Sequence, residues 1–136
     1  MKIYDETVET LSRHLCAEIE CLERLLEMLD REARALRELS LDELDAIAPL
    51  KEKLVSRQAI LSRRRSEILS EHRPDSSVQS LSELLTEAGL EPEHPLVVQI
   101  LRLRDLAAQV VDANYRNRLF APVSYTHLTL PTIYSV

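Results

Sequence analysis

The sequence predicts an all-α protein: a long antiparallel helical hairpin plus two further helices, forming an elongated helical bundle. Two observations carry this prediction. The chain contains a single glycine in 136 residues, whereas sheet proteins need glycines in turns and phosphate-binding loops need them at fixed spacings. Apolar residues, mostly leucine, also recur every three or four positions, which is the period of an amphipathic helix.

A first helix of about 35 residues is expected in the N-terminal part of the chain. Its apolar residues form a coiled-coil-like seam. The seam consists of Val8, Leu11, Leu15, Ile19, Leu22, Leu26, Leu29, Ala33 and Leu36. Charged residues such as Glu18, Glu23 and Arg31 occupy the other faces, where we expect them to meet solvent. A helix of this length needs an equally long partner.

The second helix is expected to follow Ser40, because Ser40 and Glu43 have the spacing of a capping box. Its apolar positions are Leu44, Ile47, Leu50, Leu54, Leu61 and Ile68. Pro49 should kink this helix, unless residues 42–48 form a separate turn and Pro49 begins the helix. A break at residues 72–77 ends it. The short connection between the first two helices predicts an antiparallel hairpin.

Two shorter helices are expected after the break. The third spans about Val78–Ala88 and stops at Gly89, a residue type that favours the position after a helix end. Pro95 suits the first position of the fourth helix. The fourth helix has one register of positions at Leu96, Ile100, Leu103, Ala107, Val110, Asn114 and Asn117. Both helices are expected to pack at or along one end of the hairpin.

Residues 122–136 differ from the rest of the chain, since they contain two prolines, five Ser/Thr residues and no charged residue. The run VSYTHLTLPT resembles the translation, in one frame and without a gap, of a transposase-based sequencing adaptor. We therefore expect a single domain over residues 1–121 and a non-native tail over 122–136. Tyr125, His127 and Tyr134 then carry no functional weight. The alternative is a genuine disordered tail.

The charge balance excludes several classes of partner. A formal net charge of -6 argues against nucleic-acid binding, which needs a basic surface, and against binding to an anionic membrane surface. No apolar run reaches the length of a transmembrane helix, and no signal-peptide pattern is visible. Cys16 and Cys21 have neither the spacing nor the partners of a zinc site. We expect a cytoplasmic protein without membrane insertion, metal or cofactor.

Candidate catalytic groups are few. His14, His72 and His94 have no His or Cys partner at helical spacing, so each is expected to be a solvated side chain. Residues 63–65 are three arginines that should form a solvated face, because consecutive helical residues point about 100° apart; a contact with an acidic partner is the alternative. Nothing predicts burial of Glu18, so nothing would raise its pKa. The sequence therefore predicts no enzyme.

The fourth helix has an unusual pair of amides. Asn114 and Asn117 fall on its apolar seam, where burial costs free energy unless the amide is hydrogen-bonded. One interpretation is a polar layer that sets the register of the bundle. The other is a pair of side chains that face a groove and bind the backbone of a partner.

The chain resembles the FlgN-type flagellar type III export chaperones over residues 5–120. The stretch EMLDREARALRELSLDELDAI is similar to the end of the family's hairpin, and LKEKLVSRQAILSRRRSEIL to its second helix. The late stretch LAAQVVDANYRNRLF is similar to the family's signature with two asparagines, although Arg118 stands where the family often has glycine and Phe120 where it has an aliphatic residue.

The resemblance implies an all-α cytoplasmic chaperone that is not an ATPase. It would bind the C-terminal helices of hook–filament junction proteins, prevent their premature assembly and deliver them to the flagellar export gate. Because the family uses its late helix for substrate binding, the implied binding residues are Val110, Asn114, Asn117, Leu119 and Phe120. The family's export-gate contact has no counterpart here.

A partner helix beside the fourth helix is expected to meet an apolar floor at Leu103, Ala107 and Val110. Two rival functions stay open at this point. One is another secretion chaperone of the helical-hairpin kind. The other is a structural coiled-coil adaptor that forms a homodimer through its first helix.

Overall fold

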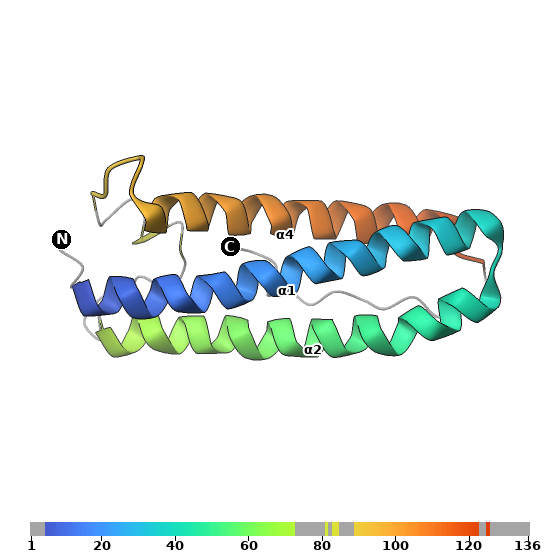
Figure 1. Cartoon of the computed structure of the whole chain (residues 1–136), viewed down its shortest axis with the longest axis horizontal. Helices are drawn as coiled ribbons and strands as arrows, with labels where there is room; N and C mark the ends of the chain where they lie inside the picture. Colours follow the sequence, from blue (N-terminus) through green and yellow to red (C-terminus); the bar gives the residue numbers. More distant parts are fainter. Residues whose placement is uncertain (1–4, 73–80, 82, 85–88, 123–124, 126–136) are drawn as a thin grey trace.

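The computed structural model describes residues 5–72, 81, 83–84, 89–122 and 125 (Figure 1). It defines three helices, which are α1 (Asp5–Glu38), α2 (Leu41–His72) and α4 (Pro95–Phe120). No strand occurs in this described part of the chain. The predicted all-α class is therefore confirmed, and α1, with 34 residues, has close to the expected length.

α1 is the central helix of the bundle, with α2 on one side and α4 on the other (Figure 1). α2 runs antiparallel to α1, as predicted, whereas α4 runs parallel to it. Among the described residues, α1 packs closely against both helices, while α2 and α4 hardly approach each other. Each of the two outer helices therefore depends on α1 for its packing.

Hydrogen bonds near both ends show that α4 follows α1 for most of its length. Ser12 donates to Gln99 Oε1 over 2.7 Å near the N-terminal ends of the two helices. Asn117 donates to the backbone carbonyl of Leu29 over 2.8 Å near their C-terminal ends. The sequence predicts packing at or along one end of the hairpin; the structure shows α4 lying along α1 rather than confined to its end, because parallel packing of two long apolar faces buries more surface.

A Schellman motif joins α1 to α2. The amide of Leu39 donates to the carbonyl of Leu36, and the amide of Ser40 donates to the carbonyl of Ala35. Leu39 has a φ of 55°, a conformation that usually takes glycine. Only half of the predicted capping box forms, because Ser40 Oγ accepts from the amide of Glu43 while the Glu43 carboxylate binds Arg31 instead.

Pro49 lies inside α2, which is one continuous helix. Figure 1 shows the first turns of α2 inclined to the rest of the helix, as expected for a proline that removes one intrahelical hydrogen bond. The structure therefore supports the kinked helix rather than a separate turn over residues 42–48.

The main core lies between α1 and α4, with contributions from the end of α2 and from two residues before α4. Its buried members are Leu11, Leu15, Leu22, Leu25, Leu29, Ile68, Leu69, Leu81, Leu84, Leu96, Ile100, Leu103, Leu106, Ala107 and Val110. A smaller cluster near the hairpin turn contains Ala35, Leu36, Leu44 and Ile47.

The predicted third helix, Val78–Ala88, lies mostly outside the described residues; Leu81, Glu83 and Leu84 are helical. Pro95 begins α4, as predicted, and the ring of His94 caps the helix by accepting from the amide of Leu96 over 3.1 Å. The expectation of a merely solvated His94 is therefore wrong.

The strained turn gives a first prediction. Leu39→Gly should stabilise the protein by about 0.5–1 kcal/mol, because glycine adopts a positive φ without steric cost and the exposed leucine loses no packing. Urea denaturation measures the change. Leu41→Gly, also exposed but with an ordinary helical backbone, should be destabilising. A less stable Leu39→Gly protein would contradict the prediction.

Candidate functional site

A buried ion pair joins α1 to α2. The ammonium of Lys51 donates to both carboxylate oxygens of Glu32, over 2.9 and 3.1 Å. The side chain of Lys51 is 2% exposed and that of Glu32 is 0% exposed. α4 completes the group, because Nδ2 of Asn117 donates both to Glu32 Oε1 over 3.0 Å and to the Leu29 carbonyl. We call Glu32, Lys51 and Asn117 the Glu32 layer.

Tyr125 adds a further donor to this layer. Its hydroxyl donates to Glu32 Oε2 over 2.7 Å, and its ring packs beside the smaller core cluster. Burial, and then the neighbouring carboxylate, raise the pKa of Tyr125. Tyr125 therefore has a structural role in the bundle, while the expectation that it carries no functional weight stays a prediction.

The ionised form of Glu32 is favoured in the folded protein. Burial alone would raise the pKa of Glu32, but the hydrogen bonds and charge of Lys51, together with the donors Tyr125 and Asn117, outweigh burial and lower it. This layer therefore stabilises the fold at neutral pH and loses that contribution as the carboxylate becomes protonated in acid.

A second polar group lies nearer the other end of the hairpin. Gln58 donates to Glu18 Oε1 over 3.1 Å, and Arg65 Nε lies 3.7 Å from Glu18 Oε2. Glu18 is fully buried, and burial raises its pKa, although the charge of Arg65 and the Gln58 hydrogen bond lower it. We call Glu18, Gln58 and Arg65 the Glu18 layer. The expectations of a solvated Glu18 and a solvated Arg65 are both wrong.

His14 borders the Glu18 layer rather than solvent. Its Nε2 lies 2.6 Å from the carbonyl of Leu61, so the ring donates from that nitrogen. Burial lowers the pKa of His14, and the charges of Arg65 and Arg64 act in the same direction, whereas the hydrogen bond to Leu61 raises it. The ring is therefore neutral in the folded protein near pH 7, and the expectation of a solvated His14 is wrong. The side chain of His72 lies outside the described residues.

A heptad pattern could have revealed these layers. Leu44, Lys51, Gln58 and Arg65 are each seven residues apart on α2 and are all buried. The sequence interpretation placed Leu50 on the buried face, but Leu50 is exposed and Lys51 takes that place. The missed signal was a row of long polar residues, from Lys51 to Arg65, at one heptad position of α2. The two ends of this row are fourteen residues apart, as are Glu18 and Glu32 on α1.

The predicted binding residues divide between two surfaces of α4. Leu103, Ala107 and Val110 are buried in the core against α1, so they form no floor of an open groove. Asn114 and Asn117 are also buried, and Asn117 uses its amide hydrogens inside the bundle, which is the geometry of a register-setting layer. Leu119 and Phe120, in contrast, are 63% and 76% exposed.

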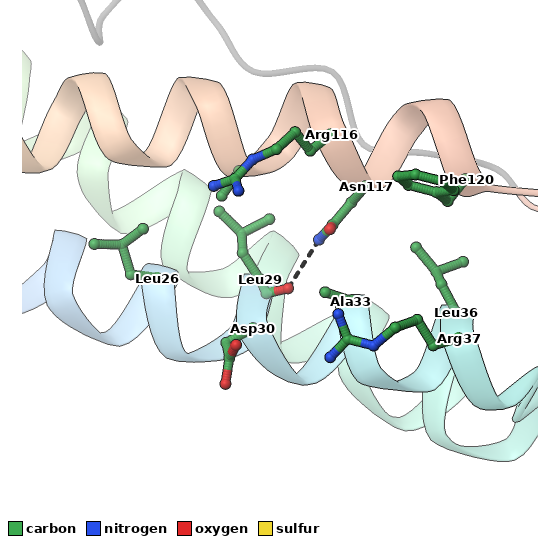
Figure 2. A pocket seen from close by; sticks show the side chains of 10 residues that line it. Leu26, Leu29, Asp30, Ala33, Leu36, Arg37, Arg116, Asn117 and Phe120 are labelled. Atoms are coloured by element: carbon green, nitrogen blue, oxygen red, sulfur yellow. Dashed lines mark hydrogen bonds between the residues drawn. The ribbon is translucent and has the colours of Figure 1, made fainter.

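A hollow of about 450 Å³ lies between α1 and the end of α4. Figure 2 shows Phe120 at one end of it and the Asn117 amide directed to the Leu29 carbonyl. The wall is mostly apolar, with charged groups around it. The lining residues are Leu26, Leu29, Asp30, Ala33, Leu36, Arg37, Ala113, Arg116, Asn117 and Phe120.

α4 also has an apolar solvent face that the sequence interpretation did not single out. Leu101, Ala108, Val111, Tyr115 and Leu119 recur at helical spacing on the side away from α1, and all are exposed. We call these five residues the solvent stripe. Six of the ten large exposed apolar residues in the described structure belong to α4, which makes this helix the leading candidate for partner binding.

Other kinds of site find no support in the described residues. They contain no group of three or more side chains suited to a metal ion. None of the helices in this part of the chain is long and apolar enough to cross a membrane.

A family model described as FlgN protein matches residues 1–128. The chain belongs to the FlgN family. FlgN proteins are flagellar export chaperones, a family not known for enzymatic activity. The match extends into the segment that resembles an adaptor translation, so the origin of that segment stays a prediction. No curated protein and no solved structure gives a significant match to the chain.

The buried ion pair gives a second prediction. Lys51→Met should destabilise this FlgN protein by about 3–5 kcal/mol, because Glu32 then loses its buried counter-charge. The double variant Glu32→Gln/Lys51→Met should lose less than the single variant, since it leaves no uncompensated charge. Urea denaturation at pH 7 measures both, with Lys53→Met, an exposed lysine nearby, as the control. Equal losses for Lys51→Met and Lys53→Met would contradict the prediction.

The third prediction concerns pH. The lowered pKa of His14 means that the unfolded chain binds a proton first as the pH falls below the ordinary value of 6.5. The free energy of unfolding should therefore decrease on acidification through that value. The His14→Phe variant lacks the titrating ring, so this pH dependence of the free energy of unfolding should be absent from it. The difference in free energy of unfolding between the wild-type protein and the variant should therefore shrink as the pH falls. A difference that is independent of pH would show that His14 does not titrate as described.

Proposed function

We propose that this FlgN family member is a cytoplasmic chaperone that binds the C-terminal helices of hook–filament junction proteins. It keeps these subunits from assembling early and delivers them to the flagellar export apparatus, without catalysing a reaction. The single observation that carries the proposal is the exposed apolar face of α4, which ends in Leu119 and Phe120. These two residues belong to the late helix that the family resemblance assigns to substrate binding.

The physical reason for such a surface is the state of the subunit before assembly. Terminal helices that pack only in the finished structure expose an apolar stripe beforehand. A chaperone helix with its own exposed apolar stripe can cover the stripe of the unassembled subunit through helix-to-helix packing. The solvent stripe and the hollow both reach the C-terminal end of α4, where Leu119 belongs to the stripe and Phe120 lines the hollow.

The rival adaptor function finds less support. An adaptor that forms a homodimer through its first helix would need a free apolar face on α1. That helix already packs against α2 and α4, and its exposed positions are charged or polar apart from Cys16. Self-association through α1 would therefore require one of the outer helices to leave.

The proposal gives a fourth prediction. Tyr115→Asp puts a charge in the solvent stripe, and because Tyr115 is 60% exposed, the fold should survive. Affinity for a C-terminal fragment of a hook–filament junction protein should fall at least about tenfold, which is roughly 1.4 kcal/mol. Isothermal titration calorimetry measures it.

The matched control is Ile60→Asp, a similarly exposed residue on the outer face of α2, which should bind like the wild-type chain. A wild-type chain that binds no junction-protein fragment would contradict the proposed function. Equal affinities of the wild-type and Tyr115→Asp chains for the fragment would show that the binding surface lies outside the solvent stripe.

A further inference from the structure

Two arginines lie along one edge of the solvent stripe. Arg104 and Arg118 are each seven residues from Val111, so the three residues share nearly the same angular position on α4. Both arginines are exposed, and neither forms an ion pair with any residue that the structure describes. Within the part of the chain that the structure describes, this edge of the stripe therefore has two positive charges without a counter-charge.

The opposite edge of the stripe is neutralised within the protein. Arg116 pairs with Asp112 over 3.1 Å, and Arg102 lies 3.6 Å from Asp105. Gln109 also donates to Asp105 over 2.8 Å. The charge around the solvent stripe is therefore asymmetric, with one basic edge and one edge of paired charges.

We infer that the solvent stripe receives one amphipathic partner helix that has acidic residues along one edge. The inference rests on the proposed function and specifies the chemistry of the helix that is bound. Apolar side chains of the partner pack between those of the stripe, and two carboxylates pair with Arg104 and Arg118. Those arginines are fourteen residues apart, so the partner's carboxylates should lie about 21 Å apart along the helix, or two heptads.

A second copy of this chain does not fit the same surface. Parallel pairing of two α4 helices in register would place Arg104 against Arg104 of the other copy. Antiparallel pairing centred on Val111 would place Arg104 against Arg118 of the other copy. Both arrangements oppose like charges, so the charge pattern favours a different chain with acidic residues over self-association.

The test uses the full chain and two synthetic amphipathic peptides with leucine heptads. One has two glutamates fourteen residues apart on one edge, and the other has lysines at those positions. Fluorescence anisotropy at low salt should show about fivefold to tenfold tighter binding of the glutamate peptide, the effect of two exposed ion pairs in place of two repulsions. Added salt should reduce the difference.

The variant Arg104→Glu/Arg118→Glu should reverse the preference to the lysine peptide. The matched control Arg57→Glu/Arg63→Glu changes the net charge equally on α2, at exposed residues without ion pairs among the described residues, and should keep the wild-type preference. Circular dichroism checks that both variants fold. Equal binding of the two peptides, no binding of either, or a control that also reverses the preference would overturn the inference.

The outcome is separable from that of the proposed function. A junction-protein fragment that binds the wild-type chain and the Arg104→Glu/Arg118→Glu variant equally would overturn the inference and leave the function standing. A chain that discriminates between the peptides but binds no junction-protein fragment would support the surface and contradict the function.

Discussion

The carboxylate of Glu32 connects the two helices that pack against α1. Lys51 reaches it from α2 and Asn117 from α4, and all three side chains are buried. Because α2 and α4 hardly approach each other in the described structure, their relative positions depend on what each contacts on α1. A buried carboxylate is tolerated only with its partners in place, so it specifies one arrangement of all three helices where apolar packing alone would allow several.

The same charges fix the register of the hairpin. Glu18 and Glu32 are fourteen residues apart on α1, as are Lys51 and Arg65 on α2, so one antiparallel register brings both glutamates to a cation. A slip of one heptad keeps the apolar seam in contact but puts Glu32 opposite Gln58 or Leu44. Such a slip would leave a charge buried without a partner, which is costly. Leucine residues supply much of the apolar contact, and the two layers select the register.

The sequence predicted the parts of the structure that are local. The apolar periodicity predicted α1 and α2, and the capping residues around Ser40 predicted the turn between them. Pro95 predicted the start of α4. The buried polar layers were missed because Glu18 and Lys51 look like ordinary surface residues until the opposite helix is in place. For α4 the difficulty is different. It has apolar residues on two faces, and periodicity identified the one with Leu103 and Val110, which the structure places in the core.

This second apolar face changes how the chaperone would work. If the partner used the core face, α4 would have to separate from α1 and the Glu32 layer would open. If it uses the solvent stripe, the bundle stays closed and α4 is a rigid docking helix held by Asn117. Preorganised binding of this kind avoids the cost of reordering the bundle each time a subunit is bound or released.

Hydrogen–deuterium exchange during binding distinguishes these two modes most directly. A C-terminal fragment of a junction protein is added to the full chain, and amide protection is compared with and without the fragment. Docking on the solvent stripe predicts added protection over residues 101–120 and unchanged protection along α1 and the outer face of α2. Loss of protection in α1 around Leu29 and Glu32 on binding, or added protection confined to α2, would contradict the account of a closed bundle with an exposed binding face on α4.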